Sequence, residues 1–324
     1  MVCVGDYSAD SSGHLSKRVP SFGRPDKYYG NGEDVAMRNG RRFLNRALDG
    51  KRANALLAAM FAVVASICFW MPADAGAGQL QVAAAADLTF VFKDVAAKFE
   101  KETGSQVKLT YGSSGNFFSQ IQNGAPFDVF FSADVSFPKR LAAAGLIEPG
   151  TIYNYARGEI VIWVPNASKL DLSKGLSVLL DPAIRKIAIA NPIHAPYGAA
   201  AIAALQHDKI FDQVKSKFVL GENISQTAQF VQSGNADVGI VALSLALAPA
   251  MKTRGRYVIV PPDDYPPLIQ AAVIIKSSPN KELAKKFLEF IKQPGTVALM
   301  ARYGFTLPEA MAAADHGGSM AAPH

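Results

Sequence analysis

Cysteine is nearly absent from the chain: its 324 residues include only two, Cys3 and Cys68. Both lie before residue 75, in a segment that we expect to be removed on export, so the mature chain would hold neither a thiol nor a disulfide. This excludes a scaffold held together by disulfides. Folding must instead depend on buried apolar side chains, and a hydrophobic content of 49% suffices for one large or two modest cores.

A concentration of basic charge is lacking too. The chain has 33 Lys and Arg, of which 10 lie in residues 1–78, and 27 Asp and Glu, of which 7 lie there. Residues 79–324 therefore hold 23 basic and 20 acidic residues. This small excess is spread along the sequence and does not favour a nucleic-acid partner. No spacing of His, Cys and carboxylate residues is typical of a metal site. We therefore expect no nucleic acid, no metal ion and no cofactor.

A long apolar run occupies residues 55–71. Several basic residues precede it, and the small-residue site Ala73-Asp74-Ala75 follows it, which is the order of a secretory signal peptide. We expect cleavage after Ala75, with Met37 as an alternative start of the chain. The other interpretation is an N-terminal membrane anchor. Residues 1–75 are thus interpreted as a leader.

Beyond residue 79, short apolar runs alternate with amphipathic helical patterns, which predicts parallel α/β units. The first helical pattern, with Leu88 and Phe92, is expected to begin at Asp87 as N-cap and to end at Gly104. Residues 309–324 are expected to form a disordered tail. The expected strands are residues 80–86, 107–111, 127–132, 160–164, 186–190, 238–242, 257–260 and 269–275, and the last helices are 282–291 and 297–303.

The turn Gly112-Ser113-Ser114-Gly115 joins one of these strands to a short helical pattern. Both serines are expected at the helix N-terminus, where N–H groups and the positive end of the dipole attract anions. The turn contains no Lys or Arg, so backbone donors and hydroxyls would meet the charge of a ligand. The alternative is an ordinary serine N-cap without a ligand.

Three other joints between a strand and a helix have a similar character. They are Ala86-Asp87, Ala195-Pro196-Tyr197-Gly198 and Glu222-Asn223-Ile224-Ser225. Ligands of open α/β sheets bind outside the carboxyl ends of the strands, so we expect the four joints to converge on one crevice.

Together these residues resemble the periplasmic molybdate-binding proteins of ABC importers, within the type II periplasmic binding-protein family. The resemblance covers residues 80–308. It is strongest in Gly112-Ser113-Ser114-Gly115 and in the following residues 120–134, QIQNGAPFDVFFSAD. Further matches in the expected order are residues 83–88, 191–192, 195–198, 239–242 and 302–305.

The resemblance implies an α/β fold of two lobes, each with a central, mostly parallel sheet flanked by helices. Residues 76–160 and 265–308 would form lobe 1 and residues 161–264 lobe 2. Two hinge crossings are expected, near residues 159–162 and 260–269. The implied function is capture of molybdate, and of tungstate, between the lobes and delivery to an ABC permease of the inner membrane. Such a protein would act in the periplasm, as a monomer and not as an enzyme.

The resemblance also implies the ligand shell. Ser114 would donate its hydroxyl and its N–H, with Ser113 supporting the turn. The N–H groups of Tyr197 and Ile224 would reach from the opposite lobe. The joint of Ala86 and Asp87 would complete the shell.

Asp87 departs from the family pattern, which usually has Ser or Asn at this position. A carboxylate cannot donate a hydrogen bond to an oxyanion unless it is protonated. In one interpretation the side chain caps its own helix while its backbone N–H faces the ligand. In the other it accepts a proton from the ligand, which would favour a protonated ion such as hydrogen phosphate. Ala242, where some relatives have tyrosine, removes one hydroxyl donor.

Other functions stay open at this point. The ligand could be another tetrahedral oxyanion, such as phosphate or sulfate. A hydrolase would use Ser113 or Ser114 as nucleophile and His194 as base, but Gly-Ser-Ser-Gly is not the Gly-x-Ser-x-Gly elbow. A regulator's effector domain can have this fold too, but here a signal peptide stands in place of DNA-binding helices.

Overall fold

The computed structural model describes residues 78–307, which belong to one compact unit, Asp74–His324. The predicted leader, residues 1–75, and the predicted tail, residues 309–324, lie outside the described residues. Within residues 78–307, no helix has both the length and the apolar character that crossing a membrane requires.

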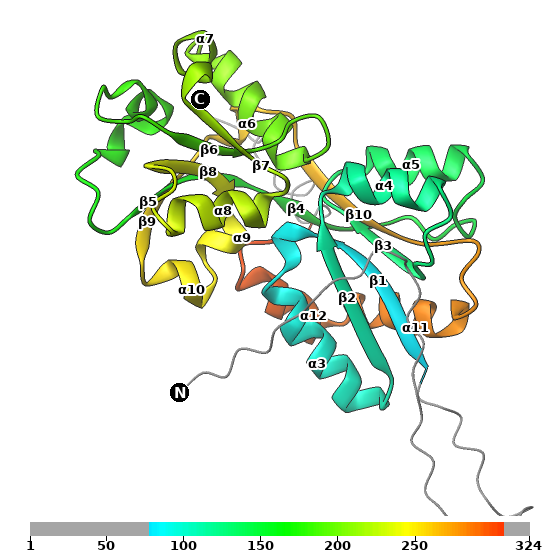
Figure 1. Ribbon diagram of the computed structural model, residues 1–324. Coiled ribbons are helices and arrows are strands. Elements are labelled where there is room, and N and C mark those ends of the chain that lie inside the picture. Colours follow the sequence, from blue (N-terminus) through cyan, green and yellow to red (C-terminus); the bar gives the residue numbers. More distant parts are fainter. Residues whose placement is uncertain (1–77, 308–324) are drawn as a thin grey trace, which may run out of the picture. The chain divides into compact units, whose positions relative to one another are not determined.

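Two five-stranded sheets organise the described part of the chain (Figure 1). The strands are β1 (Gln79–Ala85), β2 (Gln106–Gly112), β3 (Val129–Ser132), β4 (Tyr153–Gly158), β5 (Ile160–Pro165), β6 (Ile187–Ala190), β7 (Phe218–Gly221), β8 (Val238–Ala242), β9 (Gly255–Ile259) and β10 (Leu268–Ile274). The first sheet has the order β2-β1-β3-β10-β4 and the second β7-β6-β8-β5-β9. In each sheet one strand, β10 or β5, runs antiparallel to its two neighbours, and the other four share a direction. Each sheet is therefore mostly parallel, as predicted.

Helices cover the sheets. They are α3 (Val91–Thr103), α4 (Ser114–Gln122), α5 (Ser136–Ala143), α6 (Pro196–His207), α7 (Phe211–Val214), α8 (Ile224–Gln232), α9 (Leu243–Ala246), α10 (Pro249–Lys252), α11 (Lys281–Lys292) and α12 (Pro294–Ala301), with 3-10 segments η1 (Ala86–Leu88), η2 (Leu172–Leu180), η3 (Lys215–Lys217) and η4 (Pro262–Asp264). Helices α3, α11 and α12 cover one face of the first sheet, and α4 and α5 cover the other (Figure 1). Helices α6, α8 and α9 share a core with β5, β6 and β8 of the second sheet.

Strand β3 shows how the first sheet supports both of its helix layers. Phe130 packs against Phe117 of α4, with 6.2 Å between the ring centroids. The next residue, Phe131, packs against Phe92 of α3 at 4.8 Å. Successive side chains of a strand point to opposite faces, so this short buried strand contacts both layers. The packing holds the carboxyl end of β3 in place beside the ends of β1 and β2.

The chain passes between the two sheets twice. The first passage is the single residue Glu159, between the end of β4 and the start of β5. The second is residues 260–267, between β9 and β10. Both lie where the hinge crossings are expected. The bounds of the lobes, residues 76–160 with 265–308 and residues 161–264, stay a prediction.

Some local expectations are wrong. Asp87 is not the N-cap of the first α-helix, because it lies in η1 and α3 begins only at Val91. Strand β4, with the mixed sequence YNYARG, and strand β7, a short edge strand with one buried residue, have no strong apolar pattern and were not predicted. The end of α3 at Gly104 is confirmed, and its φ of 72° explains why glycine occurs there. Both serines lie at the N-terminus of α4, as predicted: Ser113 is at the N-cap position, without a capping hydrogen bond from its side chain, and Ser114 is the first helical residue.

Candidate functional site

The four joints predicted from the sequence meet around one small cavity. Its volume is about 10 Å³, close to the space that one water molecule needs. All six predicted site residues line it. The complete lining is Ala85, Ala86, Asp87, Gly112, Ser113, Ser114, Ala133, Ala195, Pro196, Tyr197 and Ile224, without a basic residue.

Three α-helices begin at this cavity. Helix α4 begins at Ser114, α6 at Pro196 and α8 at Ile224. The N–H groups of a first helical turn have no acceptor within their own helix, and the helix dipole makes this end positive. Pro196 has no N–H, so Tyr197 carries the first N–H of α6. Neutral donors from three helices therefore surround the cavity.

The two serines of α4 have different partners. Ser114 is fully buried, and its Oγ accepts a hydrogen bond of 2.9 Å from the N–H of Ala133. A hydroxyl that accepts through its oxygen can still donate its own proton. The Oγ of Ser113 instead lies 2.9 Å from Nδ1 of His194. These contacts fit a donor role for Ser114 and a supporting role for Ser113, and both roles stay predictions.

Asp87 belongs to a buried hydrogen-bond network. Its Oδ2 accepts from the hydroxyl of Tyr197 (2.9 Å) and from Nε2 of Gln270 (2.7 Å). Oε1 of Gln270 in turn accepts from the hydroxyl of Tyr155 (2.7 Å), and the backbone oxygen of Asp87 accepts from Oγ of Ser244 (2.8 Å). Oδ1 of Asp87 has no hydrogen-bond partner among the described residues. One carboxylate oxygen is thus satisfied and the other is not.

Ala85, and not Asp87, is at the N-cap position of η1. The N–H groups of Asp87 and Leu88 lie near the Asp87 carboxylate, together with its partners Tyr197 and Gln270, so the capping interpretation stays a prediction. Burial raises the pKa of Asp87 from 3.8 to about 6, and hydrogen bonds from Gln270, from Tyr197 and from nearby backbone N–H groups offset only part of this rise. Burial, assisted by the charge of Asp87, also holds the pKa of Tyr155 and Tyr197 well above 10. Both tyrosines are therefore neutral donors near neutral pH.

A second network joins α4 to loops that follow β6 and β7. Nε2 of His194 lies 3.6 Å from Oε1 of Glu222, which also accepts a hydrogen bond of 2.6 Å from Nδ2 of Asn116. The N–H of Gly115 donates to the backbone oxygen of His194 at 2.9 Å. A Cβ at Gly115 would lie 2.8 Å from the Cα of His194, so this close approach requires glycine. The walls contributed by the two sheets are therefore in direct contact.

The sequence did not reveal several residues that position the site. Gln270 offered a signal, since it is a polar residue within the otherwise apolar strand β10, where it is fully buried. Tyr155 lies in the strand β4 that was not predicted. Gly158 is needed because a Cβ there would overlap the Tyr197 hydroxyl, a constraint that exists only in the folded chain.

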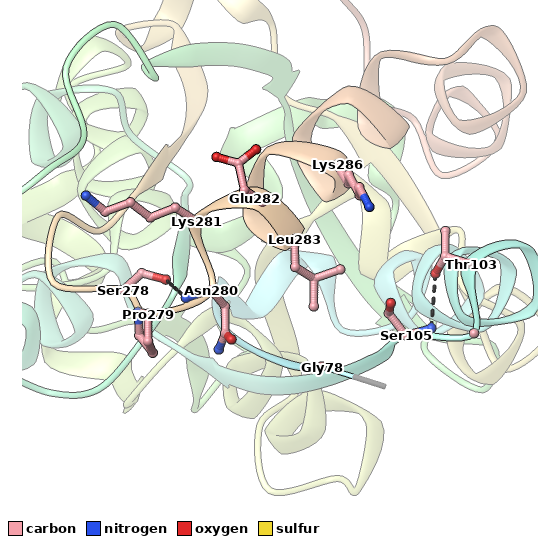
Figure 2. A pocket seen from close by; sticks show the side chains of 11 residues that line it. Gly78, Thr103, Ser105, Ser278, Pro279, Asn280, Lys281, Glu282, Leu283 and Lys286 are labelled. Carbon is pink, nitrogen blue, oxygen red and sulfur yellow. Dashed lines mark hydrogen bonds between the residues drawn. The ribbon is translucent and has the colours of Figure 1, made fainter. Parts of the chain in front are cut away.

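A larger cavity, of about 690 Å³, lies at the start of α11 beside Gly78 (Figure 2). None of the predicted site residues lines it. Its Lys281 is paired with Glu148 at 2.7 Å. Thr103 and Ser105 are hydrogen-bonded to each other on its far side. Among the described residues, this cavity is lined by no buried side-chain polar atom without a partner, whereas the small cavity has one, Oδ1 of Asp87.

A surface group could also hold a metal ion: the ligand atoms of His207, Asp208 and Asp264 lie within 4.8 Å of one another. Nδ1 of His207 lies 3.2 Å from Asp208 and 3.3 Å from Asp264. The sequence spacing does not suggest this group because Asp264 is remote along the chain. Nδ1 of His207 can donate its one hydrogen to only one of these carboxylates at a time, and exposed acidic groups of this kind are common without an ion.

Comparison with known proteins identifies the class. Residues 80–306 match the family of bacterial extracellular solute-binding proteins, and the chain belongs to this family. The molybdate-binding protein ModA of Azotobacter vinelandii is 40% identical over 233 residues, which are 72% of this chain and 92% of the relative. ModA of Rhodobacter capsulatus is 39% identical over 231 residues, 71% of this chain and 89% of the relative.

Solved structures agree with this placement. The Azotobacter vinelandii periplasmic molybdate-binding protein has a TM-score of 0.67 and 36% identity, covering 71% of this chain and 99% of that one. The sulfate-binding protein SubI of Mycobacterium tuberculosis has a TM-score of 0.59 at 17% identity, covering 76% and 92%, and shares the fold alone. The resemblance found in the sequence and the two-lobed fold that it implied are thereby confirmed.

Proposed function

We propose that the protein captures molybdate, and also tungstate, between its two lobes and delivers the ion to an ABC permease. The observation that carries this proposal is the convergence of three helix N-termini and the Ser114 hydroxyl on one cavity without a basic residue. Membership of a solute-binding family and relatives named molybdate-binding support it.

The physical task is to replace the water around a tetrahedral dianion with fixed donors. Ser114 offers a hydroxyl whose oxygen is already held by Ala133, and the N–H groups of Tyr197 and Ile224 face it from the helices of the other sheet. Hydrogen bonds to an ionised ligand are short and strong, so preorganised neutral donors suffice. Because no Lys or Arg lines the site, we expect the bound ion to remain releasable, and we expect the size of the space formed around the ion to favour molybdate or tungstate over sulfate.

Entry and release require the walls to separate. Asp87, Ser114 and Tyr197 line the cavity and are at most 2% exposed, so the walls must move apart for an ion to enter from solvent. The passages at Glu159 and at residues 260–267 are where the lobes would hinge. Closure around the ion would then present an occupied form to the permease. We place this exchange in the periplasm, with the protein acting as a monomer.

Calorimetric titration of the purified protein with molybdate, tungstate, sulfate and phosphate tests the proposal. We expect one ion per chain, with molybdate and tungstate bound more tightly than the other two. A preference for sulfate or phosphate over molybdate would overturn the choice of ligand. No binding of any of the four would overturn the anion site itself.

A hydrolase is the second candidate, because Oγ of Ser113 lies 2.9 Å from Nδ1 of His194 and Glu222 lies beyond the ring. This resembles a nucleophile, a base and an orienting carboxylate. However, Ser113 is only 4% exposed, and Gly115 is packed against His194. Turnover of a model ester that is lost in Ser113→Ala or Ser114→Ala would favour the hydrolase, whereas anion binding without turnover supports the binding protein.

A further inference from the structure

The carboxylate of Asp87, when ionised, would repel an anion that enters the cavity. The residue is 1% exposed and lines the same cavity as Ser114. Its Oδ2 is engaged by Tyr197 and Gln270, and its Oδ1 has no partner among the described residues. An ionised carboxylate in this position would repel a dianion at short range, with no basic side chain in the lining to compensate. A protonated carboxyl would instead supply one more donor.

We propose that Asp87 takes up one proton from solvent when the oxyanion binds and donates it from Oδ1 in a hydrogen bond to the ion. The proposal rests on the proposed function, because it concerns the same site. The proton comes from water or buffer and stays on Asp87 in the complex, and no bond of the ligand breaks. Oδ2 continues to accept from Tyr197 and Gln270.

The surroundings single out Asp87 as the group that takes up the proton. Tyr155 and Tyr197 face it, and burial keeps their pKa well above 10. Helices α8 and α9 pack on η1 and contain no ionisable side chain. Strand β2 also packs there and carries Lys108, which is exposed, and Tyr111, whose pKa burial raises. Burial already raises the pKa of Asp87 to about 6, which brings its protonation within reach of neutral pH.

Proton uptake can be measured by titrating the purified protein with molybdate at pH 8 in two buffers with different heats of ionisation. Molybdate carries no proton at this pH, so any proton exchanged belongs to the protein. We expect an uptake of about one proton per ion and a Kd that rises about tenfold per pH unit between pH 7 and pH 9. In Asp87→Asn, which keeps an N–H donor but cannot be protonated, we expect no uptake and a Kd independent of pH.

His194 provides the control, because its imidazole is the other proton-exchanging side chain beside the cavity, with Nδ1 2.9 Å from Oγ of Ser113. His194→Gln should keep the uptake of about one proton. Molybdate binding without proton uptake by the unsubstituted protein would overturn the proposal, and so would uptake that persists in Asp87→Asn. The measurement on the unsubstituted protein needs no variant, so absent proton uptake would overturn the proposal even if Asp87→Asn fails to fold. A protein that binds no molybdate at any pH would instead overturn the proposed function.

Discussion

Replacing Ser114 with alanine removes a hydroxyl that has two tasks. In the complex, it would donate a hydrogen bond to the anion, and a hydrogen bond to a charged group contributes about 1.5 to 3 kcal/mol. Because each 1.4 kcal/mol corresponds to a factor of ten, the Kd for molybdate should rise about 10- to 100-fold. In the free protein, its Oγ accepts from the N–H of Ala133, which is itself buried. Leaving that N–H unpaired should lower the free energy of unfolding by about 1 to 3 kcal/mol.

Two assays separate these effects: calorimetry gives the Kd, and urea unfolding without ligand gives the stability. Ser119→Ala is the matched control, since Ser119 lies on the exposed side of the same helix. Within residues 78–307 its Oγ bonds only the backbone oxygen of Gly115, at 3.2 Å. We expect it to leave the Kd unchanged and the stability within about 0.5 kcal/mol. If folded Ser114→Ala binds molybdate as tightly as the unsubstituted protein, Ser114 is not a ligand and the donor set is wrong.

Three further substitutions test other contacts. Gly115→Ala puts a Cβ 2.8 Å from the Cα of His194 and should hold the walls apart, raising the Kd for molybdate at least about tenfold in calorimetry, whereas Gly295→Ala, with nothing nearer than 3.8 Å, should not change it. Gly158→Ala forces a Cβ onto the Tyr197 hydroxyl and should destabilise the protein by about 1 to 3 kcal/mol in urea; an unchanged midpoint would contradict the tight network. Because the folded protein raises the pKa of Asp87, the protonated carboxyl adds to the free energy of unfolding. This contribution is full below pH 3.8 and is lost as the pH rises through about 6. Asp87→Asn should therefore gain stability relative to the unsubstituted protein between pH 4 and pH 8, by up to roughly 3 kcal/mol in urea unfolding, and an equal difference at both pH values would argue against a raised pKa.

The joints could be predicted from sequence because their structure is local. The period-two pattern before Gly112 and the helical pattern after Ser114 fix where β2 ends and α4 begins. The same holds for the helix that begins beside Tyr197 and the one that begins at Ile224. Once these ends were assigned, one rule sufficed to predict that the residues share a crevice: ligands of open α/β sheets bind outside the carboxyl ends of the strands.

The partners of Asp87 could not be predicted, because they come from distant parts of the chain. Tyr155 lies in a strand whose polar sequence hides its pattern, and Gln270 belongs to a strand that returns to the first sheet after the chain has built the second. The local rule that places an aspartate at a helix start therefore gave Asp87 the wrong position, since it lies within η1 and α3 begins only at Val91. The hydrogen bonds of Tyr197 and Gln270, formed only in the folded chain, determine its orientation instead.

Crystals grown with molybdate would locate the ion directly, because molybdenum scatters anomalously. We expect one molybdenum peak, in the cavity between Ser114, Asp87, Tyr197 and Ile224, with the Ser114 hydroxyl and the N–H groups of Tyr197 and Ile224 directed at its oxygens. A molybdenum peak elsewhere on the protein, with this cavity unoccupied, would contradict the assignment of the site.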